Sequence, residues 1–274
     1  KSTGEKRRMA EAKSLSGTSV ALPAADADRA YFLDIDGTLL EIAETPSGVR
    51  VDGTLVDMIR RLHECTGGAV ALISGRCVAD IDALFPGLRL PIAGQHGLER
   101  RDAAGGIHSH APEGVDWPWL KALVKGTFED GQGLIIEDKG LTLAVHFRLN
   151  PGQEDRVRES LRRIVADAGA AVSLQPGKCV MEVKPAGRDK GTALAEFMSE
   201  PPFRGRRPVF VGDDVTDEYG FRVVNDLGGD SVKVGEGETI ARWRIDDVRA
   251  VRAWLTQILE GDPDCRGGRR GSMT

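Results

Sequence analysis

The sequence predicts an α/β protein, in which a parallel sheet carries helices on both faces and a second, α+β unit is inserted into the chain. Short apolar runs at residues 31–35, 69–73 and 208–211 alternate with segments of helical periodicity, which is typical of parallel sheets. All three runs end at candidate site residues, as strands of open α/β sheets do at their carboxyl edge. Residues 101–183 differ, with hairpin-like segments and Gly-bearing turns.

Residue spacing predicts each element of the core. In the first helix, Leu55, Ile59 and Leu62 share one face at intervals of three and four residues. The run at 69–73 is apolar throughout, as expected for a strand buried on both faces of a parallel sheet. The expected strands are 31–35, 69–73, 90–93, 208–211 and 231–234, and the expected helices are 55–64, 78–84, 192–198, 215–225 and 248–259.

The inserted unit is expected to contain both helices and antiparallel strands. Residues 154–168 place Val157, Leu161 and Ile164 on one helical face, and residues 117–128 form a second helix. Turn residues separate the strands of this unit. The expected strands are 133–137, 141–147, 171–174 and 179–183, with a return strand at 107–110 after Gly105-Gly106.

These elements divide the chain into a core, a cap and two tails. Residues 31–100 and 184–260 would form the catalytic core, and residues 101–183 an inserted cap that covers its active edge. Residues 1–29 are small, polar and charged without periodicity, and are expected to form a disordered or tag-like tail. Residues 261–274 are expected to form a second, flexible tail.

Composition limits the classes of partner. The chain has 274 residues, of which 41% are hydrophobic and 29% charged, enough for a sizeable core in one large domain or two modest ones. The net charge of −5 argues against nucleic acid as the main partner, because phosphate neutralisation needs a basic surface. An anionic substrate would therefore need a local positive site. The sequence leaves the oligomeric state open.

A cytoplasmic location is expected. No apolar run approaches the roughly 20 residues of a membrane span, so no membrane partner is expected. The basic stretch near the start only faintly resembles a signal peptide, because Glu11 and Lys13 interrupt the segment that would have to be apolar. The four cysteines show no C-x-x-C pair and no zinc spacing, and are expected to be free thiols; they are Cys65, Cys77, Cys179 and Cys265.

Two carboxylates follow the first apolar run with one residue between them. If residues 31–35 form a strand, alternation places Asp34 and Asp36 on the same side at its carboxyl end. Two like charges this close repel unless a cation lies between them, and oxygen ligands favour Mg²⁺. Gly37 allows a turn, and Thr38 offers a hydroxyl and an N–H to an anion. The simpler alternative is a surface turn, which these residue types also favour.

Residues later in the chain supply partners for these acids. Lys190 is expected at the start of a helix, where an ammonium and the helix N-terminus face an anion together. Ser74 and Gly75 end a buried strand and offer a hydroxyl and N–H groups to phosphate oxygens, although a plain β–α turn has the same composition. Asp213 ends another strand and would complete a Mg²⁺ site, with Asp217 holding a bound water or Lys190. Capping of the next helix explains one of these acids but not the whole acidic cluster.

These residues suit phosphoryl transfer through a covalent intermediate. Asp34 would attack phosphorus to form an aspartyl-phosphate. Asp36 would protonate the leaving oxygen and then deprotonate the attacking water. An anionic nucleophile reacts slowly with an anionic phosphate, so a metal and Lys190 are expected to neutralise charge. The metal ligands expected from the sequence are Asp34, Asp36 and Asp213, with Mg²⁺ as the cofactor.

Four stretches in this order resemble the motifs of the haloacid dehalogenase-like phosphatases. The resemblance implies a Rossmann-like parallel sheet, with a cap inserted where residues 101–183 lie. The motifs span the core from residue 31 to residue 218. They are Asp34-Ile35-Asp36-Gly37-Thr38, Ser74-Gly75-Arg76, Lys190, and Gly212-Asp213-Asp214 with Asp217 three residues on.

Within that superfamily the chain is similar to the trehalose-6-phosphate phosphatases, over roughly residues 31–255. One departure is Phe147, which stands where the family has Tyr in a His-Tyr-Arg triplet. The stretches that carry the resemblance are Ile73-Ser74-Gly75-Arg76, residues 93–99, His146-Phe147-Arg148, residues 176–182 leading to Pro185 and Lys190-Gly191, and residues 212–218.

The cap is expected to bind the rest of the substrate. Lys178 and Glu182 are four residues apart on one expected strand, so they share a face. The resemblance implies that both contact the sugar distal to the phosphate, with Arg148 a weaker candidate; a solvated sheet face is the alternative for all three. His96 lies at the hinge, where it contacts sugar or completes a turn.

The resemblance implies Mg²⁺-dependent hydrolysis of trehalose 6-phosphate to trehalose and phosphate. Three alternatives stay open: a phosphatase of another sugar phosphate, such as sucrose phosphate or mannosylglycerate phosphate, a phosphosugar mutase, or a non-catalytic sugar-phosphate sensor. An intact Asp34 and Asp36 argue against the sensor, which needs no nucleophile.

Overall fold

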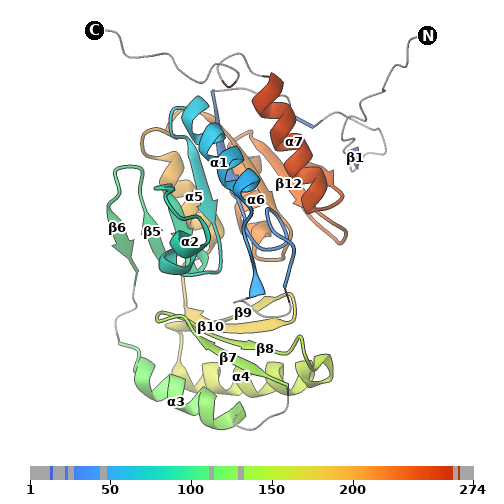
Figure 1. Cartoon of the computed structure of the whole chain (residues 1–274). Helices are drawn as coiled ribbons and strands as arrows, with labels where there is room; N and C mark the ends of the chain where they lie inside the picture. Colours follow the sequence, from blue (N-terminus) through green and yellow to red (C-terminus); the bar gives the residue numbers. More distant parts are fainter. Residues whose placement is uncertain are drawn as a thin grey trace, which may run out of the picture.

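The computed structural model describes residues 13–14, 22–23, 28–43, 48–110, 114–128, 133–261 and 265. Within them the chain forms a core around one large sheet and a smaller cap that lies at one end of that sheet (Figure 1). The middle of the chain forms the cap, and the sequence on either side of it builds the core. The expected α/β fold with an inserted α+β unit is confirmed.

The core sheet has nine strands in the described residues, in the order β1-β13-β12-β11-β2-β3-β4-β5-β6. From β13 to β4 neighbouring strands are parallel, whereas β1, β5 and β6 pair antiparallel at the two edges. The strands are β1 (Lys13–Ser14), β2 (Arg29–Leu33), β3 (Val70–Ile73), β4 (Ile92–Gly94), β5 (Glu99–Arg101), β6 (Ile107–Ser109), β11 (Arg207–Gly212), β12 (Asp230–Val234) and β13 (Trp243–Ile245).

Helices cover both faces of the core sheet because its central strands are apolar on both sides. In β2, Tyr31 and Leu33 pack with residues of α1 and α7, whereas Ala30 and Phe32 pack with residues of α5 and α6. Figure 1 shows these two pairs of helices on opposite sides of the sheet. None of the helices in the described part of the chain is long and apolar enough to cross a membrane. The core helices are α1 (Gly53–Cys65), α2 (Val78–Leu84), α5 (Lys190–Met198), α6 (Asp217–Asp226) and α7 (Val248–Gly261).

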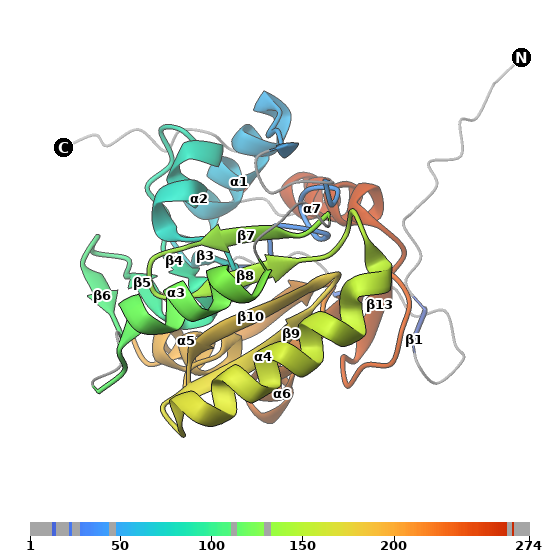
Figure 2. The same ribbon diagram turned by 90° about the horizontal axis from the view of Figure 1, so that it is seen from below.

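The cap is a four-stranded antiparallel sheet in the order β7-β8-β10-β9, with α3 and α4 on its outer face (Figure 2). Alternation along β8 and β10 turns Val145 and Met181 toward these helices, where they pack with Leu161 of α4. The opposite face of the sheet is turned toward the core. The cap elements are α3 (Trp117–Phe128), β7 (Ile135–Asp138), β8 (Leu143–His146), α4 (Glu154–Ala168), β9 (Val172–Gly177) and β10 (Val180–Pro185).

The hairpin of β5 and β6 belongs to the core sheet rather than to the cap. We expected the cap to begin near residue 101, but β5 pairs with β4 and β6 pairs with β5. The turn Gln95–Gly97 returns the chain at once along the free edge of β4, so the hairpin extends the nearest sheet. The cap's own elements therefore run from α3 to β10.

Parts of the expected N-terminal tail are packed against the core. β1 pairs with the edge strand β13, and Leu22 is buried in the core cluster. Trp254 of α7 donates its Nε1–H to the carbonyl oxygen of Pro23 at 3.2 Å. The expectation of a disordered tail is therefore wrong for these residues, because an apolar side chain and a buried indole N–H find partners there; the rest of residues 1–27 lie outside the described residues.

Two of the four cysteines are paired. Cys65, the last residue of α1, forms a disulfide with Cys265, whereas Cys77 and Cys179 are free thiols. The expectation of four free thiols is therefore wrong for the pair, and residue 265 of the expected flexible tail is held against the core. The two cysteines are 200 residues apart, so no spacing motif in the sequence connects them.

Candidate active site

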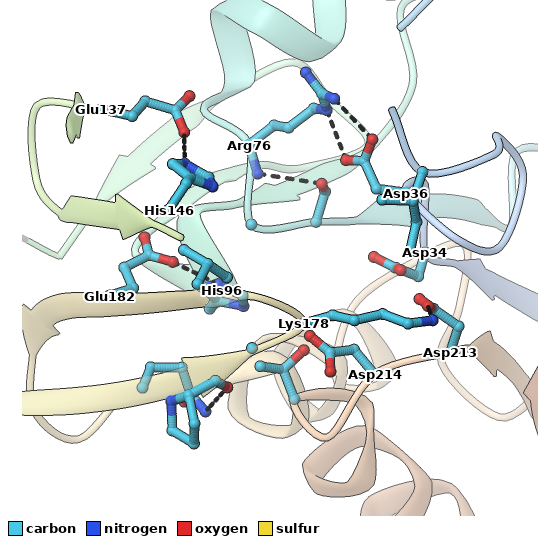
Figure 3. A pocket seen from close by; sticks show the side chains of 18 of the residues that line it. Asp34, Asp36, Arg76, His96, Glu137, His146, Lys178, Glu182, Asp213 and Asp214 are labelled. Atoms are coloured by element: carbon cyan, nitrogen blue, oxygen red, sulfur yellow. Dashed lines mark hydrogen bonds and ion pairs between the residues drawn. The ribbon is translucent and has the colours of Figure 1, made fainter. Parts of the chain in front are cut away.

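The site lies in a pocket between the carboxyl ends of the core strands and the inner face of the cap sheet (Figure 3). Asp34 follows β2, Ser74 follows β3 and Asp213 follows β11, and all three side chains line the pocket. These strands are central and parallel, so their ends meet at one edge of the sheet. The cap supplies the opposite wall.

Lys190 joins two of the core acids. Its Nζ donates to Asp34 Oδ1 at 2.9 Å and to Asp217 Oδ1 at 2.7 Å. All three side chains are buried, with Asp217 fully enclosed beneath the pocket. Lys190 begins α5, and a capping box between Asp189 and Thr192 fixes the start of that helix. The helix start therefore places the ammonium beside Asp34.

The acids outnumber the cations at this centre. Burial alone would lower the pKa of Lys190, but the carboxylates of Asp217 and Asp34 raise it well above its ordinary value, so the ammonium stays charged. Burial raises the pKa of Asp34; Lys190 opposes this, but Asp217 and Asp213 add to it. The same causes, burial first and Asp217 second, raise the pKa of Asp213 to about 6. One ammonium therefore does not neutralise this group.

The three acids fit a hard divalent cation. Carboxylate oxygens of Asp34, Asp213 and Asp217 lie within 4.8 Å of one another. Oδ1 of Asp213 is buried and has no hydrogen-bond partner among the described residues. A second cation beside Lys190 would satisfy this oxygen and remove the repulsion among the carboxylates. The donor set is oxygen alone, which suits Mg²⁺.

Asp36 does not join this acidic group through its side chain. Both of its carboxylate oxygens accept hydrogen bonds from Arg76, from Nε at 2.7 Å and from Nη2 at 2.7 Å. β2 ends at Leu33, so the strand alternation from which we expected Asp36 to ligate the metal no longer applies at residue 36. The structure therefore places the Asp36 carboxylate against Arg76 and not among the candidate ligands.

Ser74 and Gly75 form the turn beneath the cap. The Ser74 N–H donates to the carbonyl of Ala93, and its Oγ accepts from the backbone N–H of Arg76 at 3.2 Å. Lys139 of the cap donates its Nζ to the Gly75 carbonyl at 3.0 Å. The turn therefore presents a hydroxyl to the pocket and is contacted directly by the cap.

Glu182 is the centre of the polar face of the cap. Its Oε2 lies 3.0 Å from His96 Nε2, and its Oε1 accepts a hydrogen bond from Thr142 and lies 3.5 Å from Lys139 Nζ. Burial alone would raise the pKa of Glu182, but Lys139 and His96 hold it well below its ordinary value. A fully ionised, buried carboxylate thus faces the pocket from β10.

His96 completes a strained turn. Its backbone φ is 55°, and the preceding residue Gln95 has φ 46°, a region that few non-glycine residues adopt. Burial lowers the pKa of His96, and Glu182 opposes this only in part. The ring is therefore neutral near pH 7 and donates its Nε2–H to Glu182. The structure shows His96 in the turn, in contact with Glu182 of the cap, and in the lining of the pocket; the sugar contact stays a prediction.

Lys178 lies at the tip of the β9–β10 hairpin, and Arg148, which follows β8, contacts that tip. Lys178 is 58% exposed, and its Nζ reaches Asp213 Oδ2 at 3.5 Å, across the cap–core boundary (Figure 3). Arg148 donates Nη2 to the Lys178 carbonyl at 2.8 Å, which supports the hairpin tip. Both residues line the pocket.

Every site residue expected from the sequence lies in or directly beneath the pocket. Asp217 alone lies beneath it, where it holds Lys190. The expected site residues that line the pocket are Asp34, Asp36, Ser74, Gly75, Arg148, Lys178, Glu182, Lys190 and Asp213.

Sequence reasoning missed several polar side chains of the cap. Glu137 of β7 pairs with His146 of β8, with Oε2 and Nε2 2.8 Å apart, and both line the pocket. Lys139, in the following turn, reaches Glu182 and the core. Alternation along β7 and β8 would have placed Glu137 and His146 on one face of the cap sheet. Lys139 lies in a turn, where no alternation indicates the direction of its side chain.

Sequence comparison identifies relatives over most of the chain. Residues 32–249 match the model of the family described as trehalose-phosphatase. The chain is 44% identical over 237 residues to the trehalose-6-phosphate phosphatase of Escherichia coli (strain K12), which covers 86% of this chain and 88% of that protein. It is 45% identical over 206 residues to a probable trehalose-phosphate phosphatase of Sinorhizobium fredii, covering 75% and 77%.

Solved structures share the fold. The C-terminal domain of a trehalose-6-phosphate phosphatase from C. albicans matches with a TM-score of 0.74 at 22% identity, covering 84% of this chain and 91% of that one. A structure described as a trehalose-6-phosphate phosphatase related protein matches with a TM-score of 0.69 at 28% identity, covering 84% and 98%. The motif resemblance is therefore confirmed over core and cap together, and the chain belongs to the trehalose-phosphatase family of enzymes.

Proposed function

We propose that this protein hydrolyses trehalose 6-phosphate to trehalose and phosphate, with Mg²⁺ and through an aspartyl-phosphate. The observation that carries the proposal is the position of Lys190 between Asp34 and Asp217, in a group that includes an Asp213 oxygen with no hydrogen-bond partner in the part of the chain that the structure describes. A buried nucleophile with an ammonium and room for a second cation suits an anionic phosphoryl group. Relatives at 44% and 45% identity are named for this substrate class.

In the first step, an oxygen of Asp34 forms a bond to phosphorus as the bond from phosphorus to the sugar oxygen breaks. Asp36, which must be protonated before this step, gives that proton to the departing oxygen, so trehalose leaves as an alcohol and Asp36 is left as the carboxylate. In the second step, Asp36 takes a proton from water as that water attacks phosphorus, which releases phosphate and restores Asp34. Protons and bonds balance over the two steps.

The chain's own groups hold the phosphoryl group. Lys190 would neutralise charge on the nucleophile and on the transferred group, and Asp217 fixes the ammonium from below. Ser74 and Gly75 would hydrogen-bond phosphate oxygens from the β3 turn. Mg²⁺, held by Asp34 and Asp213, would supply further neutralisation of the phosphate charge.

The cap would select the sugar. Lys178, Glu182 and Arg148 were expected to contact it, and Glu137 and Lys139 face the same pocket. A disaccharide with many hydroxyls needs fixed polar partners of this kind. A poorly matched sugar would leave these polar side chains of the cap without hydrogen-bond partners and would therefore be rejected.

One substrate panel tests the substrate, the reaction type and the need for a metal together. Phosphate release from trehalose 6-phosphate, sucrose phosphate, mannosylglycerate phosphate and p-nitrophenyl phosphate would be measured with Mg²⁺ and with excess EDTA. We expect release to be fastest from trehalose 6-phosphate and abolished by EDTA. Faster release from another sugar phosphate would correct the substrate, isomerisation without net phosphate would identify a mutase, and binding without turnover a sensor. An undiminished rate of phosphate release in excess EDTA would mean that the reaction needs no metal.

A cytoplasmic location is also proposed from the sequence. The free thiols Cys77 and Cys179 agree with a reducing compartment, but the Cys65–Cys265 disulfide is of a kind that such compartments disfavour. Thiol titration of protein taken directly from cells would decide the state of this pair. A fully reduced pair would agree with the cytoplasm, and an oxidised pair would count against it.

A further inference from the structure

Arg76 forms a bidentate ion pair with Asp36, the proposed acid–base residue. Nε and Nη2 donate to the two oxygens of Asp36, each at 2.7 Å, in the parallel geometry that only arginine offers. Figure 3 shows this pair on the core side of the pocket, with Asp34 next to Asp36. The Asp36 carboxylate thus has one fixed orientation, although its side chain is 33% exposed.

The backbone of Arg76 is itself held in place. Its N–H donates to Ser74 Oγ at 3.2 Å, and its carbonyl accepts from Gln95 N–H at 2.8 Å. Gly94 lies so close that a Cβ there would be 2.8 Å from the Arg76 carbonyl oxygen. The guanidinium therefore extends from a rigid turn between β3 and α2, which is hydrogen-bonded to the residue that follows β4.

The cap approaches Arg76 from the other side. Lys139 of the cap binds the Gly75 carbonyl, the residue before Arg76, at 3.0 Å. The carboxylate of Glu137 lies close enough to help Asp36 raise the pKa of Arg76 against the effect of burial. An acid of the core and, more weakly, an acid of the cap thus both stabilise the charge of Arg76.

We propose that Arg76 is a positioning residue for Asp36: it orients the carboxylate for proton exchange with the leaving oxygen of the sugar, and acts through Asp36 rather than on the phosphate. This inference rests on the proposed acid–base function of Asp36. A carboxylate with both oxygens held by Arg76 has no freedom to rotate, and Asp36 lines the pocket, so the pair fixes the orientation in which Asp36 meets a bound substrate. The alternative is that Arg76 binds the phosphate directly.

Leaving-group dependence separates these two roles. Trehalose 6-phosphate must lose a sugar alkoxide, which needs a proton, whereas p-nitrophenyl phosphate loses a nitrophenolate that needs none. kcat/KM reports the steps up to the first bond cleavage, so it isolates proton donation to the leaving group. For Arg76→Met we expect kcat/KM to fall about 10- to 100-fold with trehalose 6-phosphate, part of the usual contribution of general acid catalysis. With p-nitrophenyl phosphate it should stay near wild type.

Two further variants test the path through Asp36. Arg76→Lys keeps the charge but cannot make the bidentate pair, so we expect the same selective loss of kcat/KM with trehalose 6-phosphate. Wild-type activity in Arg76→Lys would mean that Arg76 does not act by orienting Asp36. On trehalose 6-phosphate, Arg76→Met added to Asp36→Asn should cost nothing further, because both changes remove one function. A further loss in the double variant equal to that in Arg76→Met alone would mean that Arg76 acts independently of Asp36.

Arg101 provides a matched control. Arg101, on β5, makes a bidentate ion pair with Asp82, with both contacts at 2.8 Å. Neither residue lines the pocket. Arg101→Met should lower the melting temperature without selectivity between the two substrates. Equal losses on both substrates in Arg76→Met would overturn the inference and indicate a phosphate contact or a folding defect, which the melting temperature distinguishes.

The proposed function can fail separately. Activity retained by Asp34→Asn would remove the covalent mechanism. If Asp36→Asn lowered kcat/KM equally with both substrates, the proposed acid function of Asp36 would be wrong. The inference for Arg76, which depends on that function, would then be wrong as well. If Asp36→Asn is selective and Arg76→Met is not, the proposed function stands and the inference alone is wrong.

Discussion

The ammonium of Lys190 lies 2.9 Å from Oδ1 of Asp34, although the two residues are 156 positions apart in the chain. Both side chains are buried, so the pair is shielded from solvent and its charges interact strongly. Asp217 holds the same ammonium from below at 2.7 Å. The position of the proposed nucleophile is thus fixed by groups from α5 and α6.

Lys190→Met should reduce kcat by at least about 10²-fold, the scale on which a single preorganised charge stabilises a transition state. The substitution leaves buried carboxylates without their ammonium, so the melting temperature should fall as well. Lys184→Met is a suitable control, because Lys184 is an equally buried lysine that donates to the Arg188 carbonyl and does not line the pocket. A comparable loss of kcat in Lys184→Met would mean that buried lysines here serve the fold alone.

Asp213→Asn should weaken Mg²⁺ binding at least about tenfold, since even outer partners of metal ligands contribute that much. The measurement is calorimetric titration of the substrate-free protein with MgCl₂, which does not depend on turnover. Asp214→Asn is the control: Asp214 is the next residue, but its Oδ1 accepts from the Val215 N–H and it is not in the acidic group. If Asp214→Asn weakened binding as much as Asp213→Asn, the assignment of the ligands would be incorrect.

The core site was predictable because each of its residues lies next to the end or the start of a strand or helix that can be recognised in the sequence. Apolar runs identified the strands before Asp34, Ser74 and Asp213, and parallel strands bring their carboxyl ends together. Lys190 was expected at a helix start, and α5 begins at that residue. Neither inference needs any knowledge of side-chain packing.

The direction of the Asp36 side chain was not predictable in this way. Alternation holds only within a strand, and β2 ends three residues earlier, at Leu33. The partner of Asp36, Arg76, lies 40 residues away on a different turn. Likewise, Lys139 lies in a turn whose direction depends on how the cap meets the core. The Cys65–Cys265 pair joins two segments 200 residues apart with no common motif.

Glu182→Ala should reduce kcat/KM for trehalose 6-phosphate about 10²-fold or more, as expected when a sugar hydroxyl loses a fixed, buried partner. The loss should be much smaller for p-nitrophenyl phosphate, which has no sugar to bind. Glu182→Gln keeps the shape but removes the charge that pairs with Lys139 and His96, and should lie between Glu182→Ala and wild type. Equal losses on both substrates would show that the cap does not select the sugar.

His96 should make the protein less stable in mild acid. Burial lowers its pKa in the folded state, so the unfolded chain, whose histidine titrates near 6.5, binds the proton first as the pH falls. The free energy of unfolding should therefore decrease below about pH 6.5, by at most about 1.4 kcal/mol per pH unit from this group. His63 and His110, whose pKa values are also lowered by burial, add to the slope.

His96→Gln isolates the share of His96. Denaturant unfolding of the variant and of the wild type between pH 7 and pH 5 should give a shallower slope for the variant. His63→Gln is the control, because His63 lies outside the cap–core boundary. It should remove only the contribution of His63 to the pH slope of the free energy of unfolding. Parallel slopes for His96→Gln and wild type would mean that His96 is not buried as a neutral ring.

Gly37→Ala should damage the metal site through a direct clash. Gly37 has φ +84°, and a Cβ there would lie 2.1 Å from Asp213 Oδ2, so the ligand would have to move. Gly105→Ala is matched in backbone strain, with φ +89°, but a Cβ there meets nothing within 4 Å. Both variants should lose about 1–2 kcal/mol of stability, the cost of a side chain in the left-handed region.

Only Gly37→Ala should also lose Mg²⁺ affinity and turnover, each at least about tenfold, because only there does the new methyl group displace a ligand. Thermal unfolding, calorimetric Mg²⁺ titration and phosphate release measured on both variants separate strain from displacement. If Gly37→Ala bound Mg²⁺ as tightly as Gly105→Ala, Asp213 Oδ2 would have no part in holding the metal. The close approach of the β2 turn to Asp213 would then serve packing alone.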